Sequence, residues 1–288
     1  MPHYICETCG TQFAASEEPP RLCPICSDER QYVGLSGQKW TTMEKLHTDH
    51  KNDILHLEEN LFGIGTAPSF AIGQRALLVR TPQGNILWDC ISLIDDATIE
   101  EINKLGGLRA IAVSHPHYYG AMADWANAFE VPVFLHIDDQ QWVMRHDPTL
   151  VFWDGETMDI GDGLTLVRAG GHFDGGVMLH WPQGDEGRGA LLTGDIIQIN
   201  PDRLSVSFMY SYPNHIPLSA RKVRRIQDSV SQYRFDRMYG AFWHRVIHAN
   251  GQDVLARSVD RYLRAIEDKD EESYSVSLEE GYSVMERI

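Results

Sequence analysis

Short apolar runs alternate with amphipathic stretches along most of the chain. The runs RALLVRT (75–81) and NILWDCISLI (85–94) flank Pro82-Gln83-Gly84 and predict a β-hairpin. The next stretch, DDATIEEINKLGG (95–107), has apolar residues at helical spacing and ends in glycine, which predicts a helix. LRAIAVSH (108–115) then predicts a buried strand. The same reasoning predicts strands at 131–136, 164–172, 176–182 and 189–195, and helices at 122–130, 219–233 and 254–268.

These elements form two β-rich halves, which we assign to a core domain at residues 61–267. Residues 1–36 read as a separate small module because they hold most of the cysteines. Residues 37–60 are polar with scattered apolar positions, so we interpret them as a linker. Residues 268–288 are acidic and predict a frayed C-terminal tail.

Composition limits the classes of function. The chain has 288 residues, of which 43% are hydrophobic, enough to bury a large core. Its net charge of −16 argues against a nucleic-acid partner, because phosphate binding is carried by Lys and Arg. No apolar run could cross a bilayer, and the start, MPHYICETCG, lacks a secretion signal. We therefore expect a cytoplasmic protein with a small-molecule substrate and no membrane partner, and a homodimer is a candidate assembly.

The first cysteines form two closely spaced pairs. Cys6 and Cys9 are separated by two residues, and so are Cys23 and Cys26, with thirteen residues between the pairs. Each pair presents two thiolates on one turn, so two pairs can close around one ion. A metal site is favoured over two disulfides in a chain without a secretion signal. Cys90 lies in an apolar run and predicts a buried, inert thiol.

The pattern YICETCG…LCPIC resembles the rubredoxin-like ribbon at the end of rubrerythrins, although Ser27 stands where a glycine commonly follows the last cysteine. That resemblance implies zinc or iron. We expect zinc as a structural ion, with iron as the alternative.

Histidines and one aspartate follow several predicted strands. His115 and His117 end one apolar run, His172 follows another in AGGHFDGG, Asp195 follows LLTG, and His244 lies in GAFWHRVI. Because each has Gly or another small residue nearby, the backbone can turn sharply and bring these side chains to one ion.

The order of these segments over about residues 60–267 resembles the metallo-β-lactamase-fold hydrolases, and Asp89 in ILWDC matches the structural aspartate of an early strand. The resemblance implies an α+β fold, a four-layer αββα sandwich, preceded here by the small four-cysteine metal ribbon. It also implies a first motif, His-x-His-x-Asp-His, whose Asp-His pair serves a second metal. Tyr119 and Gly120 occupy those positions. Three histidines and Asp195 then remain as a mononuclear site for zinc, with iron as the alternative.

A metal-dependent hydrolase of an ester, lactone or thioester is the function that this ligand set favours, with metal-activated water as the nucleophile. Asp195 would orient or deprotonate the water, while Tyr119 and His244 are the candidates to stabilise developing charge. His248 could replace His244, and Tyr118, Tyr210, Tyr212 and His215 are candidates for shaping a pocket. The alternatives are a mononuclear iron oxidoreductase resembling persulfide dioxygenases and a non-catalytic binding protein.

Overall fold

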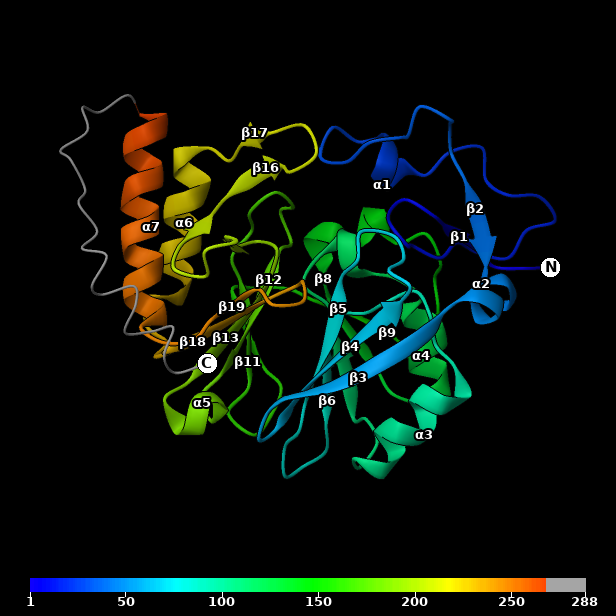
Figure 1. Cartoon of the computed structure of the whole chain (residues 1–288), viewed down its shortest axis with the longest axis horizontal. Helices are drawn as coiled ribbons and strands as arrows, with labels where there is room; N and C mark the ends of the chain where they lie inside the picture. Colours follow the sequence, from blue (N-terminus) through cyan, green and yellow to red (C-terminus); the bar gives the residue numbers. More distant parts are fainter. Residues whose placement is uncertain (268–288) are drawn as a thin grey trace.

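Two β-sheets pack face to face in the computed structural model, which describes residues 1–267 (Figure 1). The predicted acidic tail, 268–288, lies outside the described residues. The first sheet has seven strands in sequence order: β3 (Lys51–Glu58), β4 (Leu61–Ala67), β5 (Arg75–Val79), β6 (Ile86–Trp88), β7 (Ala110–Ala112), β8 (Val133–His136) and β9 (Leu150–Trp153). The second sheet has the order β10 (Thr157–Asp159), β11 (Thr165–Arg168), β12 (Val177–Trp181), β13 (Ala190–Gly194), β18 (Arg237–Gly240) and β19 (Val246–Ile247).

Helices cover the outer face of each sheet. The first sheet carries α3 (Asp96–Lys104) and α4 (Met122–Phe129), and the second carries α6 (Ala220–Val230) and α7 (Gly251–Ile266) (Figure 1). The remaining short elements are α5 (Gly184–Gly187), the 3-10 turns η1 (Pro116–Tyr118) and η2 (Ile137–Trp142), and the pairs β14 (Gln198–Ile199) with β15 (Val206–Ser207) and β16 (Met209–Ser211) with β17 (Ile216–Pro217). The predicted α+β, four-layer αββα sandwich is confirmed.

Side-chain alternation along the strands explains the layers. In β5, Leu77 faces the interior between the two sheets, whereas Leu78 packs beneath the helices of the first sheet. In β13, Leu192 faces the interior and Leu191 packs under α6 and α7. Since successive strand residues point to opposite faces, strands that are buried on both sides must be apolar throughout. The predicted hairpin is present as well, with Val79 paired to Ile86.

The stretch 37–60 is not a linker, and this corrects the sequence interpretation. Residues Trp40–Thr42 form β2, which pairs with β1 (Tyr4–Cys6) inside the N-terminal module. A short helix, α2 (Met43–Asp49), follows, and β3 (Lys51–Glu58) is the edge strand of the seven-stranded sheet. This edge strand reads as polar because most of its residues are partly or fully exposed.

The N-terminal module, residues 1–42, lies against the core rather than apart from it (Figure 1). We call it the ribbon. It contains β1, β2 and α1 (Pro24–Ser27), and its cysteines are buried together with Phe13 and Ile25. Within residues 1–267, no helix combines the length and apolar character that a bilayer crossing requires.

Candidate metal centre

His115 and His117 lie where the chain turns sharply after β7. The backbone N–H of Ser114 donates a hydrogen bond to Oδ1 of Asp89 at 2.8 Å, which fixes the start of the turn. The 3-10 turn η1 then places the two imidazole rings 5.3 Å apart between centroids. Ser114 Oγ lies 3.0 Å from Nδ1 of His115, so the opposite ring atom, Nε2, is directed to its other neighbours.

His172 and Asp195 reach the same place from loops after β11 and β13 of the second sheet. His115 Nε2 lies 3.1 Å from His172 Nε2 and 2.9 Å from Asp195 Oδ1. The distance from His172 Nε2 to Asp195 Oδ1 is 3.5 Å. With His117 included, the four potential ligand atoms all lie within 4.8 Å of one another. The structure therefore brings the four predicted ligands together at one end of the sandwich.

Burial keeps the imidazoles uncharged. It lowers the pKa of His115 and of His117 to about 3, and it lowers the pKa of His172 well below its usual range. The positive charge of Arg30 acts in the same direction on all three. Neutral imidazoles have a free lone pair at neutral pH, and this is the form that binds a metal.

Two unpaired polar atoms test whether a cation fits this cluster. Nε2 of His117 and Oδ1 of Asp195 are buried and make no hydrogen bond within residues 1–267, although His115 Nε2 lies 2.9 Å from that oxygen. A buried polar atom without a partner is costly, and a bound cation would satisfy both. Three nitrogen ligands and one carboxylate also form a donor set common in mononuclear sites. The residues fit a metal ion, and the cluster is a candidate metal-binding site.

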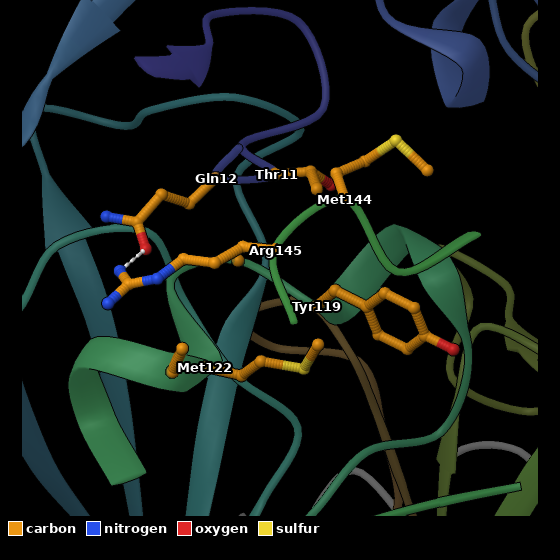
Figure 2. Close-up of a pocket in the computed structure, with 8 residues that line it drawn as sticks. Thr11, Gln12, Tyr119, Met122, Met144 and Arg145 are labelled. Atoms are coloured by element: carbon orange, nitrogen blue, oxygen red, sulfur yellow. Dashed lines mark hydrogen bonds between the residues drawn. The ribbon is translucent and has the colours of Figure 1, made fainter. Parts of the chain in front are cut away.

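Tyr119 does not face this cluster, contrary to the sequence interpretation. Its hydroxyl donates to the backbone carbonyl of Asp139 at 3.3 Å, and its ring extends away from Gln12 and Arg145 (Figure 2). This geometry does not support a catalytic role for Tyr119.

Gly120 has no room for a ligand side chain. Its φ of 48° is in the left-handed region, and a Cβ atom there would lie 2.7 Å from the carbonyl oxygen of Ile91. That oxygen belongs to the backbone and accepts a hydrogen bond from the N–H of Ala121, so it cannot move aside easily. The position that supplies a histidine in the family motif is sterically closed here.

We expect Gly120→Ala to reduce the free energy of unfolding by about 2 to 4 kcal/mol, the sum of left-handed backbone strain and overpacking. Gly155→Ala is the matched control, because Gly155 also has a positive φ of 96° but nothing lies within 4 Å of the place that a Cβ atom would take. Gly155→Ala should lower the free energy of unfolding only by the backbone strain. Urea unfolding of both variants measures the difference, and equal midpoints would contradict the steric argument.

His244 is likewise outside the cluster. It is exposed, lies at a turn with a φ of 63°, and is not among the four residues whose ligand atoms converge. The neighbouring Trp243 packs over Gly63 and Gly65 of β4, which turns this segment along the first sheet. The predicted catalytic role for His244 is not supported by its position. His248 is partly buried, and its carbonyl accepts a hydrogen bond from Arg237.

Two other tyrosines, Tyr118 and Tyr212, lie beside the ligands of the core cluster. Tyr118 is fully buried with its ring centroid 4.8 Å from that of His115, and its hydroxyl has no hydrogen-bond partner in the described chain. Burial, together with the neighbouring Asp195 carboxylate, raises its pKa well above the usual value. The Tyr212 hydroxyl donates to the backbone carbonyl of Asp195 at 2.8 Å. Tyr118, rather than Tyr119, is therefore the tyrosine of this turn whose ring lies against His115.

The ribbon cysteines form a second cluster. The Sγ atoms of Cys6 and Cys26 lie 3.6 Å apart, those of Cys9 and Cys23 lie 3.7 Å apart, and all four atoms are within 4.8 Å of one another. These separations rule out disulfides and match the roughly 3.8 Å expected between thiolates around an ion with bonds of about 2.3 Å. Nε2 of Gln38 donates to Cys6 Sγ at 3.0 Å, as expected for a thiolate acceptor. The cluster is a candidate metal-binding site.

The sequence patterns did not point to Arg30, a ribbon residue that lies near the core cluster. Arg30 donates from Nη1 to the backbone carbonyl of His172 at 2.9 Å, and its guanidinium lies 4.2 Å from the centre of the Phe173 ring. No sequence pattern distinguishes Arg30 from the other arginines, because its partners follow about 140 residues later. Only the tertiary structure brings them together.

Solved structures resemble this fold. DIM-1 metallo-β-lactamase superposes with a TM-score of 0.57 at 16% sequence identity, covering 75% of this chain and 98% of that one. TMB-1 gives a TM-score of 0.58 at 12% identity, with the same coverage of 75% and 98%. SMB-1 in complex with mercaptoacetic acid gives 0.52 at 15% identity, with 76% and 97% covered. At these identities the likeness shows the fold.

A sequence relative covers nearly the whole chain. The protein named "Uncharacterized protein YmaE" of Bacillus subtilis (strain 168) is 50% identical over 268 residues, which span 92% of this chain and 97% of that protein. No protein-family model matches the sequence. The alignment is long enough to include both the ribbon and the core. The chain therefore has the metallo-β-lactamase fold and belongs to the same family as YmaE of Bacillus subtilis.

Proposed function

We propose that the protein is a metal-dependent hydrolase that uses one zinc ion, held by His115, His117, His172 and Asp195, to cleave an ester, lactone or thioester-like small molecule. The convergence of these four buried side chains, with unpaired atoms on His117 and Asp195, carries the proposal. We infer a single ion because the two positions of the motif that would serve a second metal carry no ligand: the Tyr119 hydroxyl bonds the Asp139 carbonyl, and Gly120 has no room for a side chain.

The residues around the cluster have separable tasks. A zinc ion bound there would lower the pKa of its water to roughly 7 and would polarise a carbonyl. The three neutral imidazoles would hold the ion, and Asp195 would orient the water as well as ligate. Tyr212 fixes the backbone of Asp195 through its hydrogen bond. Tyr118 keeps its phenol protonated, so its hydroxyl can donate a hydrogen bond to a developing oxyanion.

Two measurements test this function. Elemental analysis of the full chain should find zinc in both clusters, and an anomalous-scattering map should show one peak between the three histidines. The protein should then hydrolyse members of a panel of esters, lactones and thioesters, and chelation should abolish that activity. Two peaks about 4 Å apart would contradict the single-ion site. Iron in the core with oxygen uptake on a thiol substrate would support an iron oxidoreductase instead.

Tyr118→Phe should leave the metal content unchanged and lower kcat by about 100-fold, the typical cost of removing one oxyanion donor. The change removes only the hydroxyl, which makes no hydrogen bond in the described chain. Tyr119→Phe is the matched control, since its hydroxyl bonds the Asp139 carbonyl outside the cluster, and kcat should stay near that of the wild type. Equal kcat values for the two variants would exclude Tyr118 from the reaction.

A further inference from the structure

The segment that leaves the last cysteine pair is held rigidly. It starts at α1, where the N–H of Asp28 donates to the Pro24 carbonyl at 3.2 Å. Asp28 then binds Arg30 through three hydrogen bonds: its Oδ1 accepts from Arg30 Nε at 2.6 Å and from the Arg30 backbone N–H at 3.0 Å, and its Oδ2 accepts from Nη2 at 2.9 Å. The guanidinium therefore has one orientation relative to Cys26, only a few residues away.

The other end of this guanidinium is attached to the core ligand loop. Nη1 donates to the carbonyl of His172, and the guanidinium lies over two aromatic rings that meet edge to face: its central carbon is 4.2 Å from the ring centre of Phe173 and 4.9 Å from that of Trp142. Trp142 also packs against the buried cysteine cluster of the ribbon. A planar, bidentate and stacked arginine is a geometry that lysine cannot reproduce.

The ribbon holds the other ligand loop as well. The backbone N–H of Gln12 donates to the carbonyl of Gly120 at 3.0 Å, next to η1. The Gln12 side chain joins Asp124 of α4 at 2.6 Å and also contacts Arg145 (Figure 2). Nearby, Ser92 Oγ donates to the carbonyl of Gly10 at 2.7 Å. Thus the loops of both sheets that carry the core histidines are tied to one small module.

We propose that Arg30 is a positioning residue that couples the two metal sites: by fixing the His172 backbone to the ribbon, it makes the metal affinity of the core cluster depend on a folded, metal-loaded ribbon. Three of the five guanidinium N–H groups are engaged in this arrangement: Nε and Nη2 each donate to Asp28, and Nη1 donates to the His172 carbonyl. The inference rests on the proposed core metal site but not on any reaction there.

The test uses the full chain loaded with Co²⁺ and titrated with a competing chelator. Cobalt bound to thiolates absorbs strongly in the near ultraviolet, whereas cobalt bound to histidines and a carboxylate gives only weak visible bands, so each site reports separately. Arg30→Lys should keep the thiolate bands and weaken cobalt binding at the core by about 10- to 100-fold, the usual effect of losing an outer-shell partner. The control, Arg21→Lys, changes an exposed ribbon arginine and should leave both sites as in the wild type.

Each outcome decides the matter. Core affinity in Arg30→Lys within a factor of two of the wild type would overturn the coupling. If Arg30→Lys lost its thiolate bands, the ribbon itself would be damaged, and Asp28→Asn would be tested instead. That substitution weakens the hydrogen bonds that orient the guanidinium but keeps Arg30. It should also weaken cobalt binding at the core. Unchanged core bands there would also overturn the proposal. A wild-type core that binds no cobalt would instead refute the proposed metal site itself.

Discussion

His172→Ala should leave the protein with its ribbon ion but without its core ion. The substitution removes one of three direct nitrogen ligands, and we expect core metal affinity to fall by more than about 100-fold, beyond the effect of losing an outer-shell partner. The His172 backbone carbonyl, which Arg30 binds, is retained in alanine. The measured metal content should therefore fall from two equivalents per chain to one, and hydrolytic activity should disappear with the core ion.

His180→Ala is the control for that experiment. His180 is also buried, but its Nε2 bonds the carbonyl of Arg234 at 2.9 Å and it does not belong to either candidate metal cluster. It should lower stability by about 1 to 3 kcal/mol, the cost of leaving a buried polar group without its partner, and keep both ions. Retention of two equivalents in His172→Ala would contradict the assignment of the ligands.

Cys23→Ser should remove the ribbon ion and unfold the ribbon. Residues 1–42 are too few to bury a sufficient apolar core alone, so the ion supplies their folding free energy, about 10 kcal/mol for comparable sites. The two sheets contain no ribbon strand and should stay folded, as far-ultraviolet circular dichroism would show. The core site should bind its ion more weakly, because the ribbon holds Gly120 and His172.

Cys90→Ser provides the comparison, since Cys90 is buried in the first sheet's outer core and lies outside the cysteine cluster. It should retain two equivalents of metal. Hydrogen exchange of the ribbon amides separates the two variants: fast exchange in Cys23→Ser and protection in Cys90→Ser are expected. Protected ribbon amides in metal-free Cys23→Ser would show that the ribbon folds by packing on the core alone.

Local patterns were sufficient for most of the sandwich. The hairpin around Pro82-Gln83-Gly84, the helix after Asp95 and the buried strands follow from residue periodicity and turn chemistry, which act over a few residues. The cysteine spacing specified a cluster for the same reason, since two tight turns suffice to present four thiols. The ligand positions at strand ends could also be read, because sharp turns with small residues mark the end of each strand.

What depends on distant packing could not be read. The edge strand β3 resembles a linker because solvent, rather than a second layer, covers much of it. Which of Tyr118 and Tyr119 lies beside His115 depends on the path of the chain through η1, and the hydrogen bonds of Gln12 to Gly120 and of Tyr119 to Asp139 help to fix that path. The sequence by itself determined the central strands of both sheets, the longer helices and the two clusters of ligand residue types. Only the tertiary structure showed that Arg30 binds the backbone of His172 and that His244 lies outside the cluster. Contacts between residues far apart in the chain leave no periodic pattern in either segment, so the sequence alone could not reveal them.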